Sequence, residues 1–304
     1  MALHALLCAV LAGALLVPAA RAQNPPSPAA AASVQRLADI PYGSHPRQRM
    51  DLYLPTPAPA TGTGTGTGTG APVILMVHGG AWSMGDKARG GVVQEKVARW
   101  VPRGLVLVSV NYRLLPGANV LQQAQDVAAA LAAIQGRAAH WGADASRVLL
   151  MGHSAGAHLV ALVSASPALA RQAGARPWLG TVALDSAALD VPAVMAAPHP
   201  AFYDRVFGPD PAFWQAASPL HALADAAPPP FLLVCSTQRG DGSCPQAQAM
   251  ARRVQALGGR AEVLPQALNH GQINGELGRE SDYTRAVEAF MASLDSVVAQ
   301  ALGR

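Results

Sequence analysis

The chain of 304 residues contains little charge, and its basic residues do not cluster. Charged residues make up 13% of the sequence, and the net charge of +4 comes from scattered arginines. Proteins that bind nucleic acids gather lysine and arginine on one face or along one helix. The composition therefore argues against nucleic acid or another polyanion as the partner.

The apolar run near the N-terminus, residues 5–17, is too short to cross a membrane. It has thirteen residues, whereas a helix that spans a bilayer needs about 20. Pro18 and an Ala20-Arg21-Ala22 site follow it, an order typical of a secretory signal peptide. The sequence predicts a signal peptide over 1–22, a flexible spacer over 23–32, and export to the periplasm or the medium without stable membrane insertion after cleavage.

Cysteine is scarce as well: Cys8 falls in the predicted signal, which leaves Cys235 and Cys244 in the mature chain. No cysteine and histidine cluster has the spacing of a zinc site, so we expect no metal centre. An oxidising compartment permits a disulfide between Cys235 and Cys244, and we expect this bridge. The alternative is a buried strand cysteine beside a free thiol.

Strand and helix patterns alternate along one continuous series, which predicts a single α/β domain over 33–304. The expected strands are 49–54, 72–77, 105–110, 148–151, 179–184, 231–235 and 262–264. The expected helices are 92–100, 120–140, 155–164, 245–257 and 283–298. Alternation of this kind favours right-handed crossovers and a mostly parallel sheet, with catalytic groups at the carboxyl ends of the strands.

Two segments interrupt the series. Residues 61–70 are a Thr-Gly repeat, which cannot pack a core and is expected to form a loop between two strands. Residues 186–230 are rich in proline, alanine and aromatic residues and follow neither period. We expect this second segment to form a cap over the site.

The pentapeptide Gly152-His153-Ser154-Ala155-Gly156 lies between an apolar run, 148–151, and a helical pattern. That is the setting of a nucleophile elbow, in which a serine occupies a strained turn between a strand and a helix. Its two glycines are expected because a Cβ there would clash with the neighbouring strand and helix. Ser154 is therefore the candidate nucleophile, and an ordinary turn is the alternative.

A second motif, His78-Gly79-Gly80-Ala81-Trp82, follows the expected strand 72–77. A glycine-rich turn in that place can direct backbone N–H groups at a developing oxyanion. We expect the oxyanion to be held by the N–H of Ala155 and that of Gly80 or Ala81. Trp82 either lines the acyl or alcohol pocket or packs beside the turn.

With both motifs the chain resembles the α/β-hydrolase superfamily, and within it the bacterial esterases with an H-G-G-x-W oxyanion loop, which include feruloyl esterase-like and kynurenine formamidase-like enzymes. The resemblance covers roughly 34–298. Further segments typical of that group are Tyr42-Gly43, Asp51-Leu52-Tyr53-Leu54-Pro55, Ser109-Val110-Asn111-Tyr112-Arg113-Leu114 and Asn269-His270-Gly271. The resemblance implies a mostly parallel central sheet with helices on both faces and a small cap or insertion between the sixth and seventh core strands.

The general base is expected to be a histidine, since imidazole accepts and returns a proton near neutral pH. His270 follows the last expected strand by a few residues, where the order Ser, Asp, His of this superfamily places its histidine. His78 belongs to the oxyanion turn and is expected to shape it. His153 and His158 flank the serine, and His158 is expected to pack or to form local hydrogen bonds.

The acid has four candidates, which are Asp185, Asp190, Asp225 and Asp241. Asp241 is preferred because its loop, after the strand 231–235, looks like the acid loop of the resembling family. Asp185, at the end of the preceding strand, is the second choice. A Cys235–Cys244 bridge would close around Asp241 and limit the freedom of that loop.

These residues predict acyl transfer from a small or aromatic ester through Ser154, His270 and Asp241, with no metal or organic cofactor. Two other hypotheses stand beside this one. An arylformamidase is permitted by the oxyanion loop, although export argues against it. A non-catalytic binding module that has kept the fold is the hypothesis of another class. The exact substrate and the oligomeric state are not legible in the sequence.

Overall fold

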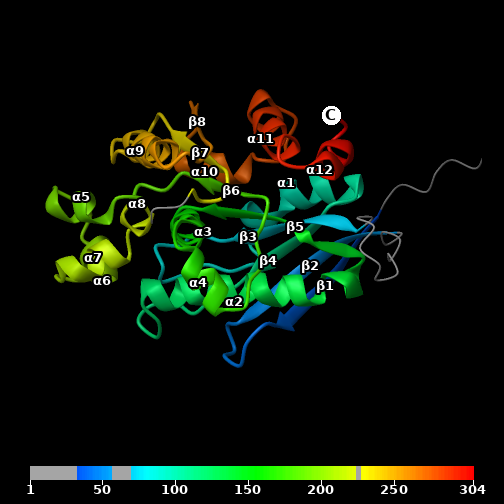
Figure 1. Ribbon diagram of the computed structural model, residues 1–304, viewed down its shortest axis with the longest axis horizontal. Helices are drawn as coiled ribbons and strands as arrows, with labels where there is room; N and C mark the ends of the chain where they lie inside the picture. Colours follow the sequence, from blue (N-terminus) through cyan, green and yellow to red (C-terminus); the bar gives the residue numbers. More distant parts are fainter. Residues whose placement is uncertain (1–32, 57–69, 224–226) are drawn as a thin grey trace, which may run out of the picture. The chain divides into compact units, whose positions relative to one another are not determined.

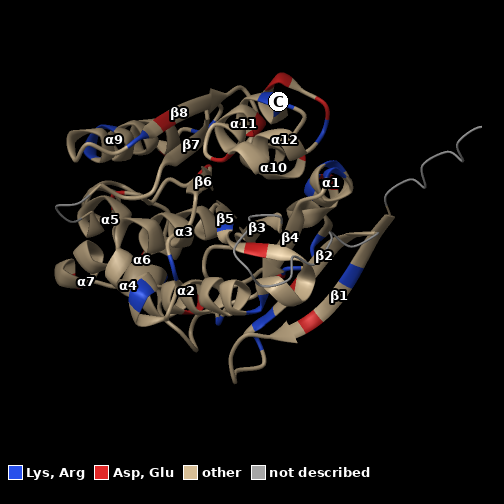
Figure 2. Ribbon diagram, turned by 45° about the vertical axis from the view of Figure 1, so that its right-hand side comes forward, with Lys and Arg blue, Asp and Glu red and all other residues tan. Residues whose placement is uncertain are grey.

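The computed structural model describes residues 33–56, 70–223 and 227–304, all within one unit that begins at Ala32. The expected signal peptide, the spacer and residues 61–69 of the Thr-Gly repeat lie outside the described residues. Among the described residues, no helix is both long and apolar enough to span a bilayer. Figure 2 shows lysine and arginine on β1 (Ser33–Pro41), α1 (Gly90–Trp100), α4 (Pro167–Gln172) and α9 (Ser243–Ala256) and not gathered on one element.

Eight strands form one sheet in the order β1-β2-β4-β3-β5-β6-β7-β8. The pairs β1–β2 and β2–β4 are antiparallel, and every later pair is parallel. The strands are β1 Ser33–Pro41, β2 Arg49–Thr56, β3 Ala71–Val77, β4 Val106–Val110, β5 Ala143–His153, β6 Gly180–Leu184, β7 Phe231–Ser236 and β8 Ala261–Gln266. The prediction of a mostly parallel sheet is confirmed.

The central strands are apolar without alternation because both faces of the sheet are covered. In β3, Val73, Leu75 and Val77 contribute to one core, whereas Ile74 and Met76 contribute to another. Figure 1 shows α1, α11 (Asp282–Ala292) and α12 (Ser296–Ala301) on one side of the sheet and α2 (Val120–Arg137) and α4 on the other. Each β3 side chain therefore packs under a helical layer.

The helices agree with the expected series in type and order. They are α1 Gly90–Trp100, α2 Val120–Arg137, α3 Ala155–Ala165, α4 Pro167–Gln172, α9 Ser243–Ala256, α10 His270–Gly275, α11 Asp282–Ala292 and α12 Ser296–Ala301, with short 3-10 helices at Val101–Arg103 and Ala138–Trp141.

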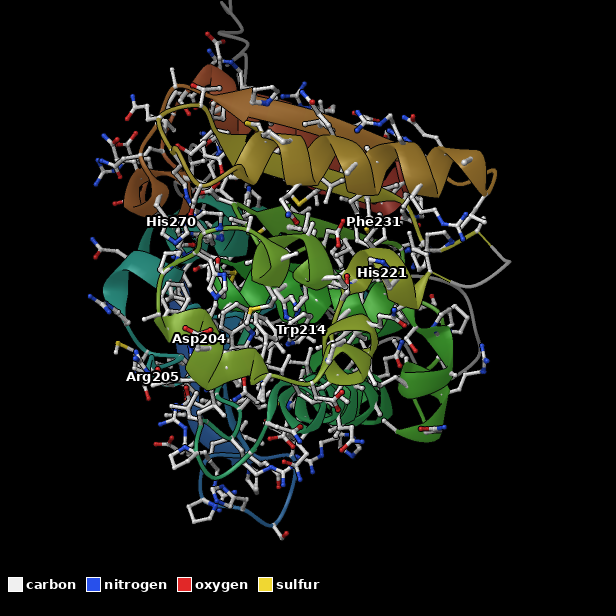
Figure 3. The ribbon with its side chains drawn as sticks, turned by 90° about the vertical axis from the view of Figure 1, so that its left-hand side faces the viewer. Asp204, Arg205, Trp214, His221, Phe231 and His270 are labelled. Carbon is white, nitrogen blue, oxygen red and sulfur yellow. A yellow bond between two sulfur atoms is a disulfide. The ribbon has the colours of Figure 1, made fainter. Side chains whose placement is uncertain are left out.

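The insertion between β6 and β7 forms a cap of four short helices. These are α5 Val191–Ala196, α6 Phe202–Phe207, α7 Pro211–Ala216 and α8 Pro219–Ala222. Aromatic residues of α6 pack on the glycine-rich turn 78–82, because the ring of Trp82 lies 5.3 Å from that of Phe207 and 6.1 Å from that of Tyr203. Figure 3 shows α6, which carries Asp204 and Arg205, on the same side of the molecule as His270.

The short helices α4 and α10 were not expected from the sequence, and two further elements differ from the expectation. Strand β1 was not expected, and its residues are mostly exposed, so they carry no apolar pattern that would predict a strand. The single helix expected at 283–298 is divided into α11 and α12. Asp295 divides it, since its Oδ1 accepts hydrogen bonds from the N–H groups of Val297 and Val298, at 2.8 and 3.1 Å, and so begins a new helix.

Candidate active site

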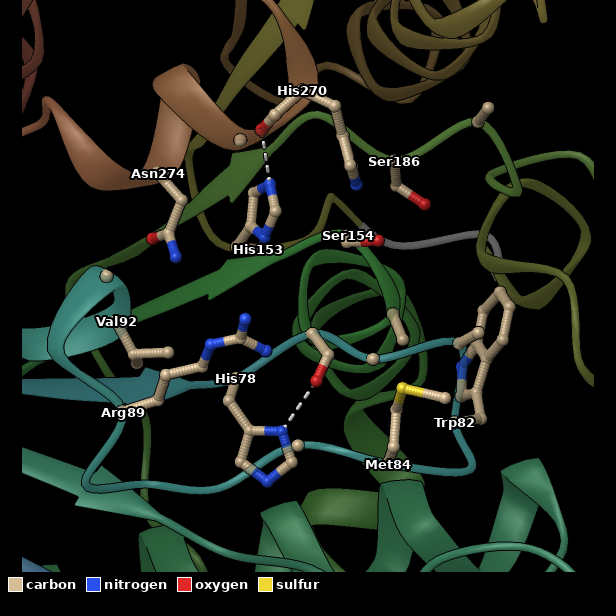
Figure 4. A pocket seen from close by; sticks show the side chains of 18 of the residues that line it. His78, Trp82, Met84, Arg89, Val92, His153, Ser154, Ser186, His270 and Asn274 are labelled. Carbon is tan, nitrogen blue, oxygen red and sulfur yellow. Dashed lines mark hydrogen bonds between the residues drawn. The ribbon is translucent and has the colours of Figure 1, made fainter.

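Loops at the carboxyl ends of four adjacent parallel strands meet above one part of the sheet. The turn 78–82 follows β3, Ser154 follows β5, Asp185 follows β6, and the loop 237–242 follows β7. His270, the first residue of α10, comes from beyond β8. Residues from these loops line a cavity of about 570 Å³ (Figure 4), at the edge where parallel sheets bind their ligands.

Ser154 occupies a strained turn between β5 and α3. Its φ is 58° and its ψ is −119°, outside the regions that L-residues prefer. Its backbone N–H donates to Leu184 O at 2.9 Å, which ties the turn to the neighbouring strand β6. The geometry is that of the predicted nucleophile elbow.

The two glycines of the pentapeptide allow close backbone packing. A Cβ on Gly152 would lie 2.3 Å from Gly156 O in α3, and one on Gly156 would lie 2.2 Å from Val77 O in β3. No side chain fits at these distances, so α3 sits against the sheet only with glycine at both positions. The reason given from the sequence is confirmed.

The glycine-rich turn after β3 passes directly beside Ser154. A Cβ on Gly79 would lie 2.9 Å from the Cβ of Ser154. Gly80, Ala81 and Trp82 all have positive φ values, 125°, 48° and 57°. Within the described part of the chain, the N–H groups of Gly80 and Ala81 have no hydrogen-bond acceptor. The N–H of Ala155 opens α3, where a helix leaves its first donors unpaired.

His78 shapes this turn, as the sequence predicts. Its Nδ1 donates to Gly79 O at 2.7 Å, and its ring stacks on Tyr112 with centroids 4.5 Å apart. The hydroxyl of Tyr112 donates to His78 O at 3.0 Å. Burial lowers the pKa of His78 to about 4, so the ring is neutral at neutral pH.

Trp82 both borders the cavity and joins the turn to the cap. Its Nε1 donates to Nδ1 of His158 at 3.3 Å, and Nε2 of His158 donates to Ala217 O at 2.8 Å. Trp82 is only 3% exposed. The two roles weighed for Trp82 are therefore compatible, whereas His158 bonds to the turn and the cap and not only locally.

The side chain of His270 is directed toward Ser154, and one edge of its ring contacts a carboxylate. Nδ1 of His270 is 2.6 Å from Oδ2 of Asp185, and Figure 4 shows the side chain of His270 directed toward Ser154. Both residues line the same cavity. In this arrangement Nδ1–H donates to the carboxylate, and Nε2 is left for the serine.

The acid preferred from the sequence, Asp241, does not contact His270, and the second choice, Asp185, occupies that place. Asp241 accepts two hydrogen bonds from Arg239: Nε donates to Oδ1 at 2.9 Å, and Nη2 donates to Oδ2. Asp185 is reached by His270 because β6 lies directly beside β5, which ends at the serine. Its positive φ, 59°, is a further mark of a constrained strand end. The feature of the sequence that could have identified Asp185 is its position directly after an apolar strand, β6, that follows the strand of the serine, β5.

Asp190, another candidate acid, has a different contact. Asp190 caps α5, since its carboxylate accepts from the N–H of Ala193 at 3.2 Å. Asp225 lies outside the described residues.

The Asp185 carboxylate is fully buried and is held as an anion. Burial by itself would raise its pKa, but hydrogen bonds from His270, Ser243, the backbone of Ser236 and Arg239 outweigh this and hold the pKa below its usual range. A buried anion of this kind requires such compensation. It therefore remains charged at every pH at which the protein is expected to work.

His153, the second residue of the pentapeptide, fixes the backbone of His270. Its Nε2 donates to His270 O at 2.8 Å, and the two ring centroids are 4.4 Å apart. Burial, and then the nearby ring of His270, lower the pKa of His153 to about 3. His153 is thus a neutral donor, a role that sequence reasoning missed because it depends on a contact across 117 positions.

The cavity walls combine apolar and charged groups. Met84, Val92, Phe202 and Tyr203 supply apolar surface, and Met84 is 62% exposed. Arg89 extends its guanidinium into the cavity (Figure 4) and forms no ion pair with any residue that the structure describes. Over the same described ranges, no three histidine, cysteine, aspartate or glutamate side chains are grouped as a metal site would require.

Cys235, at the end of β7, and Cys244, at the start of α9, form a disulfide with an S–S distance of 2.07 Å. The expected pairing is therefore present. It encloses the loop that carries Arg239 and Asp241, as expected, but the side chain that this loop presents to His270 is Arg239, at 2.8 Å between Nη1 and Nδ1.

Comparison with known proteins identifies esterases and related hydrolases. The family model described as BD-FAE matches residues 50–177. Isoprenylcysteine alpha-carbonyl methylesterase ICME of Arabidopsis thaliana is 33% identical over 129 residues, which are 42% of this chain and 27% of that protein. Esterase LipQ of Mycobacterium tuberculosis is 31% identical over 209 residues, 64% of this chain and 47% of that protein. Kynurenine formamidase of Salmo salar is 29% identical over 129 residues, 42% of this chain and 38% of that protein. The chain spans less than half the length of these curated relatives.

Solved structures of esterases share the fold. Esterase B from Lactobacillus Rhamnosis has a TM-score of 0.67 at 20% identity, with 88% of this chain and 87% of that chain covered. Esterase 2 of Thermogutta terrifontis, phosphonylated by sarin, has a TM-score of 0.66 at 19% identity, with 89% and 98% covered. At these identities the likeness concerns the fold alone.

The close packing of Gly156 yields a test of the elbow. We expect Gly156→Ala to lower the free energy of unfolding by about 1–3 kcal/mol, because its methyl group overlaps a strand carbonyl. Gly136→Ala is the matched control: it lies in α2 with open space around it, and we expect it to raise stability by about 0.5–1 kcal/mol. Urea denaturation measures both, and equal stability of Gly156→Ala and the wild type would contradict the packing described.

Proposed function

We propose that the chain is a member of the bacterial esterase group of the α/β-hydrolase superfamily, and that it is a serine carboxylesterase that acts through an acyl-enzyme. One observation carries the proposal: the ring of His270 lies between the buried carboxylate of Asp185, at 2.6 Å, and the strained serine of the elbow. This is the arrangement of nucleophile, base and orienting acid in serine hydrolases. Ser154, His270 and Asp185 take these three roles.

In the first half of the reaction, Nε2 of His270 takes the proton of Ser154 as Oγ bonds to the ester carbonyl carbon. The carbonyl oxygen becomes an oxyanion, which accepts hydrogen bonds from the N–H of Ala155 and that of Gly80 or Ala81. Each such donor is worth about 3 kcal/mol in the transition state. The ester C–O bond then breaks, and His270 returns the proton to the leaving alcohol.

In the second half, water replaces the alcohol. His270 removes a proton from water, whose oxygen attacks the acyl carbon, and the proton passes to Oγ of Ser154 as the acid leaves. Throughout, Asp185 holds the Nδ1–H tautomer and stabilises the imidazolium. His153 binds the backbone oxygen of His270, and Asp185 binds its ring, so the imidazole needs little reorganisation during the reaction.

The substrate class that we propose is a small or aromatic ester. The cavity of about 570 Å³ is lined by Phe202 and Tyr203 of the cap together with Val92. Aromatic side chains favour stacked or edge-on contact with an aromatic acyl group. Amide hydrolysis of the arylformamidase type is the second candidate, because the kynurenine formamidase relative aligns over 42% of the chain.

We also propose export to the periplasm or the medium. The predicted signal peptide at 1–22 supports it, and so does the Cys235–Cys244 disulfide, since disulfides persist in oxidising compartments.

Substitution of the nucleophile tests the activity. A panel of p-nitrophenyl acetate, methyl ferulate, an acetylated xylose and N-formylkynurenine is assayed with the wild type and with Ser154→Ala. We expect ester turnover by the wild type and a loss of at least about 10⁴-fold in kcat for the variant. Preferred turnover of N-formylkynurenine would favour the formamidase instead. If a fluorophosphonate fails to label Ser154 and no substrate is turned over, the hypothesis of a non-catalytic binding module is correct.

Paired substitutions identify the acid. We expect Asp185→Asn to lower kcat by about 10⁴-fold, because the amide no longer holds the working tautomer of His270. Asp241 has a 36% exposed side chain and reaches His270 only through Arg239. Loss of such an ion pair is worth at most about 1 kcal/mol, so Asp241→Asn should cost less than about tenfold. The reverse order of kcat values would restore Asp241 as the acid.

A substitution in the cap tests the acyl pocket. We expect Phe202→Ala to raise KM for an aromatic acyl ester by up to about tenfold, the value of one aromatic contact, while KM for an acetyl ester changes little. Phe213→Ala, another half-buried cap residue that does not line the cavity, is the control. Equal effects of the two substitutions on both esters would contradict a role for Phe202 in binding.

A further inference from the structure

The disulfide closes a short ring of chain, residues 235–244, next to the candidate acid. Cys235 is a buried residue near the end of β7, and Cys244 lies in the first turn of α9. The two Cα atoms are 5.1 Å apart. We call this segment the disulfide ring. Its ends are thereby fixed to one strand and one helix, so the loop between them has little freedom.

The disulfide ring supplies the hydrogen bonds that hold Asp185 in place. Oδ1 of Asp185 accepts from the N–H of Ser236 at 2.9 Å and from the hydroxyl of Ser243. Oδ2 accepts from Nη1 of Arg239 at 2.9 Å. Among the described residues, the only other side-chain contact of this carboxylate is His270. Every donor except the base itself therefore comes from one ten-residue ring.

The side chain of Arg239 extends from the disulfide ring to both Asp185 and His270. Its Nη1 also donates to the backbone oxygen of Asp185 at 3.0 Å, and it lies 2.8 Å from Nδ1 of His270. The hydrogens of Nη1 are directed at the two Asp185 oxygens, and the single hydrogen of Nδ1 is directed at Oδ2. The guanidinium thus packs against the edge of the imidazole without sharing a proton with it.

The outer edge of the same guanidinium is held by Asp241. Nε and Nη2 of Arg239 both donate to that carboxylate, a paired geometry that only arginine provides. Asp241 balances the charge of Arg239 and fixes the direction of its planar group. Asp241, which the sequence favoured as the acid, therefore contacts Arg239 and not His270.

From these contacts we infer that the disulfide ring is the device that positions the acid, with Arg239 as its positioning residue, and that full turnover requires the Cys235–Cys244 bond. The inference rests on the proposed function. It assigns to Arg239 no contact with the reacting atoms: the arginine acts through Asp185, which in turn orients His270. If the disulfide ring were loosened, the carboxylate of Asp185 would shift and the imidazole of His270 would turn away from Ser154.

Substitution of Arg239 tests the inference with the disulfide intact. We expect Arg239→Met to lower kcat by about 100-fold, the cost of a displacement of about 1 Å in a catalytic group, with KM within about threefold of the wild type. Arg239→Lys should fall between the two, because lysine keeps the charge but not the paired contacts. Arg252→Met, an exposed arginine of α9 outside the ring, is the control and should match the wild type. An unchanged kcat in Arg239→Met would overturn the inference.

Removal of the bond tests the ring as a whole. We expect the double variant Cys235→Ala/Cys244→Ala, checked for folding by circular dichroism, to lose kcat to a similar extent with an unchanged KM. A folded double variant with the kcat of the wild type would overturn the requirement for the disulfide. Where this variant does not fold, Arg239→Met alone decides the role of the ring.

A measurement that needs no substrate separates this inference from the proposed function. Proton NMR of the wild type should show the Nδ1–H of His270 shifted far downfield by the carboxylate, a resonance assigned by its loss in Asp185→Asn. We expect Arg239→Met and the double cysteine variant to broaden or lose it, and Arg252→Met to keep it. If these losses occur but no ester is hydrolysed, the ring positions the acid and the proposed function is wrong. If esters are hydrolysed and the resonance survives in both ring variants, the proposed function holds and the inference is wrong.

Discussion

An ionised carboxylate without solvent exposure is tolerated in a protein only where hydrogen bonds replace the water that it has lost. Asp185 meets this condition through donors from four segments: the end of β7, Arg239 of the loop that follows it, the start of α9, and the ring of His270 at the start of α10. The same hydrogen bonds that make the buried charge possible also bring those segments together. The orientation of His270, and with it the chemistry of Ser154, therefore depends on the stability of one buried anion.

The parallel sheet places this anion near Ser154, the nucleophile that we propose. Neighbouring parallel strands end at the same edge, so the residues that follow β5 and β6 are adjacent without any special loop. Ser154 and Asp185 are both held at positive φ, and the N–H of Ser154 bonds back to the last residue of β6. Strain of this kind persists only where surrounding packing imposes it. The close contacts at Gly152 and Gly156 impose it here, since they leave α3 one position on the sheet.

Local signals made part of the site predictable. The elbow around Ser154 and the turn at 78–82 follow apolar strands and contain glycines that close backbone packing requires, and these properties can be read in short segments. His270 was predictable from its place after the last strand. The edge strand β1 was not, because its exposed side chains have no apolar alternation.

The acid could not be predicted in the same way, because two aspartates follow neighbouring strands and either loop is long enough to approach a histidine. Contacts between side chains decide which aspartate reaches His270. Arg239 forms hydrogen bonds with Asp241, and donors of the disulfide ring form hydrogen bonds with Asp185. Neither set of hydrogen bonds produces a pattern that can be recognised in a short stretch of sequence. The role of His153 was missed for the same reason, since it bonds to a carbonyl 117 positions away.

A crystal structure of the protein after reaction with a phosphonate ester would test the central claim most directly. The account predicts phosphorus bonded to Oγ of Ser154, a phosphoryl oxygen within hydrogen-bond distance of the N–H of Ala155 and that of Gly80 or Ala81, and Asp185 still on Nδ1 of His270. An adduct on another residue, or His270 turned onto Asp241, would contradict it.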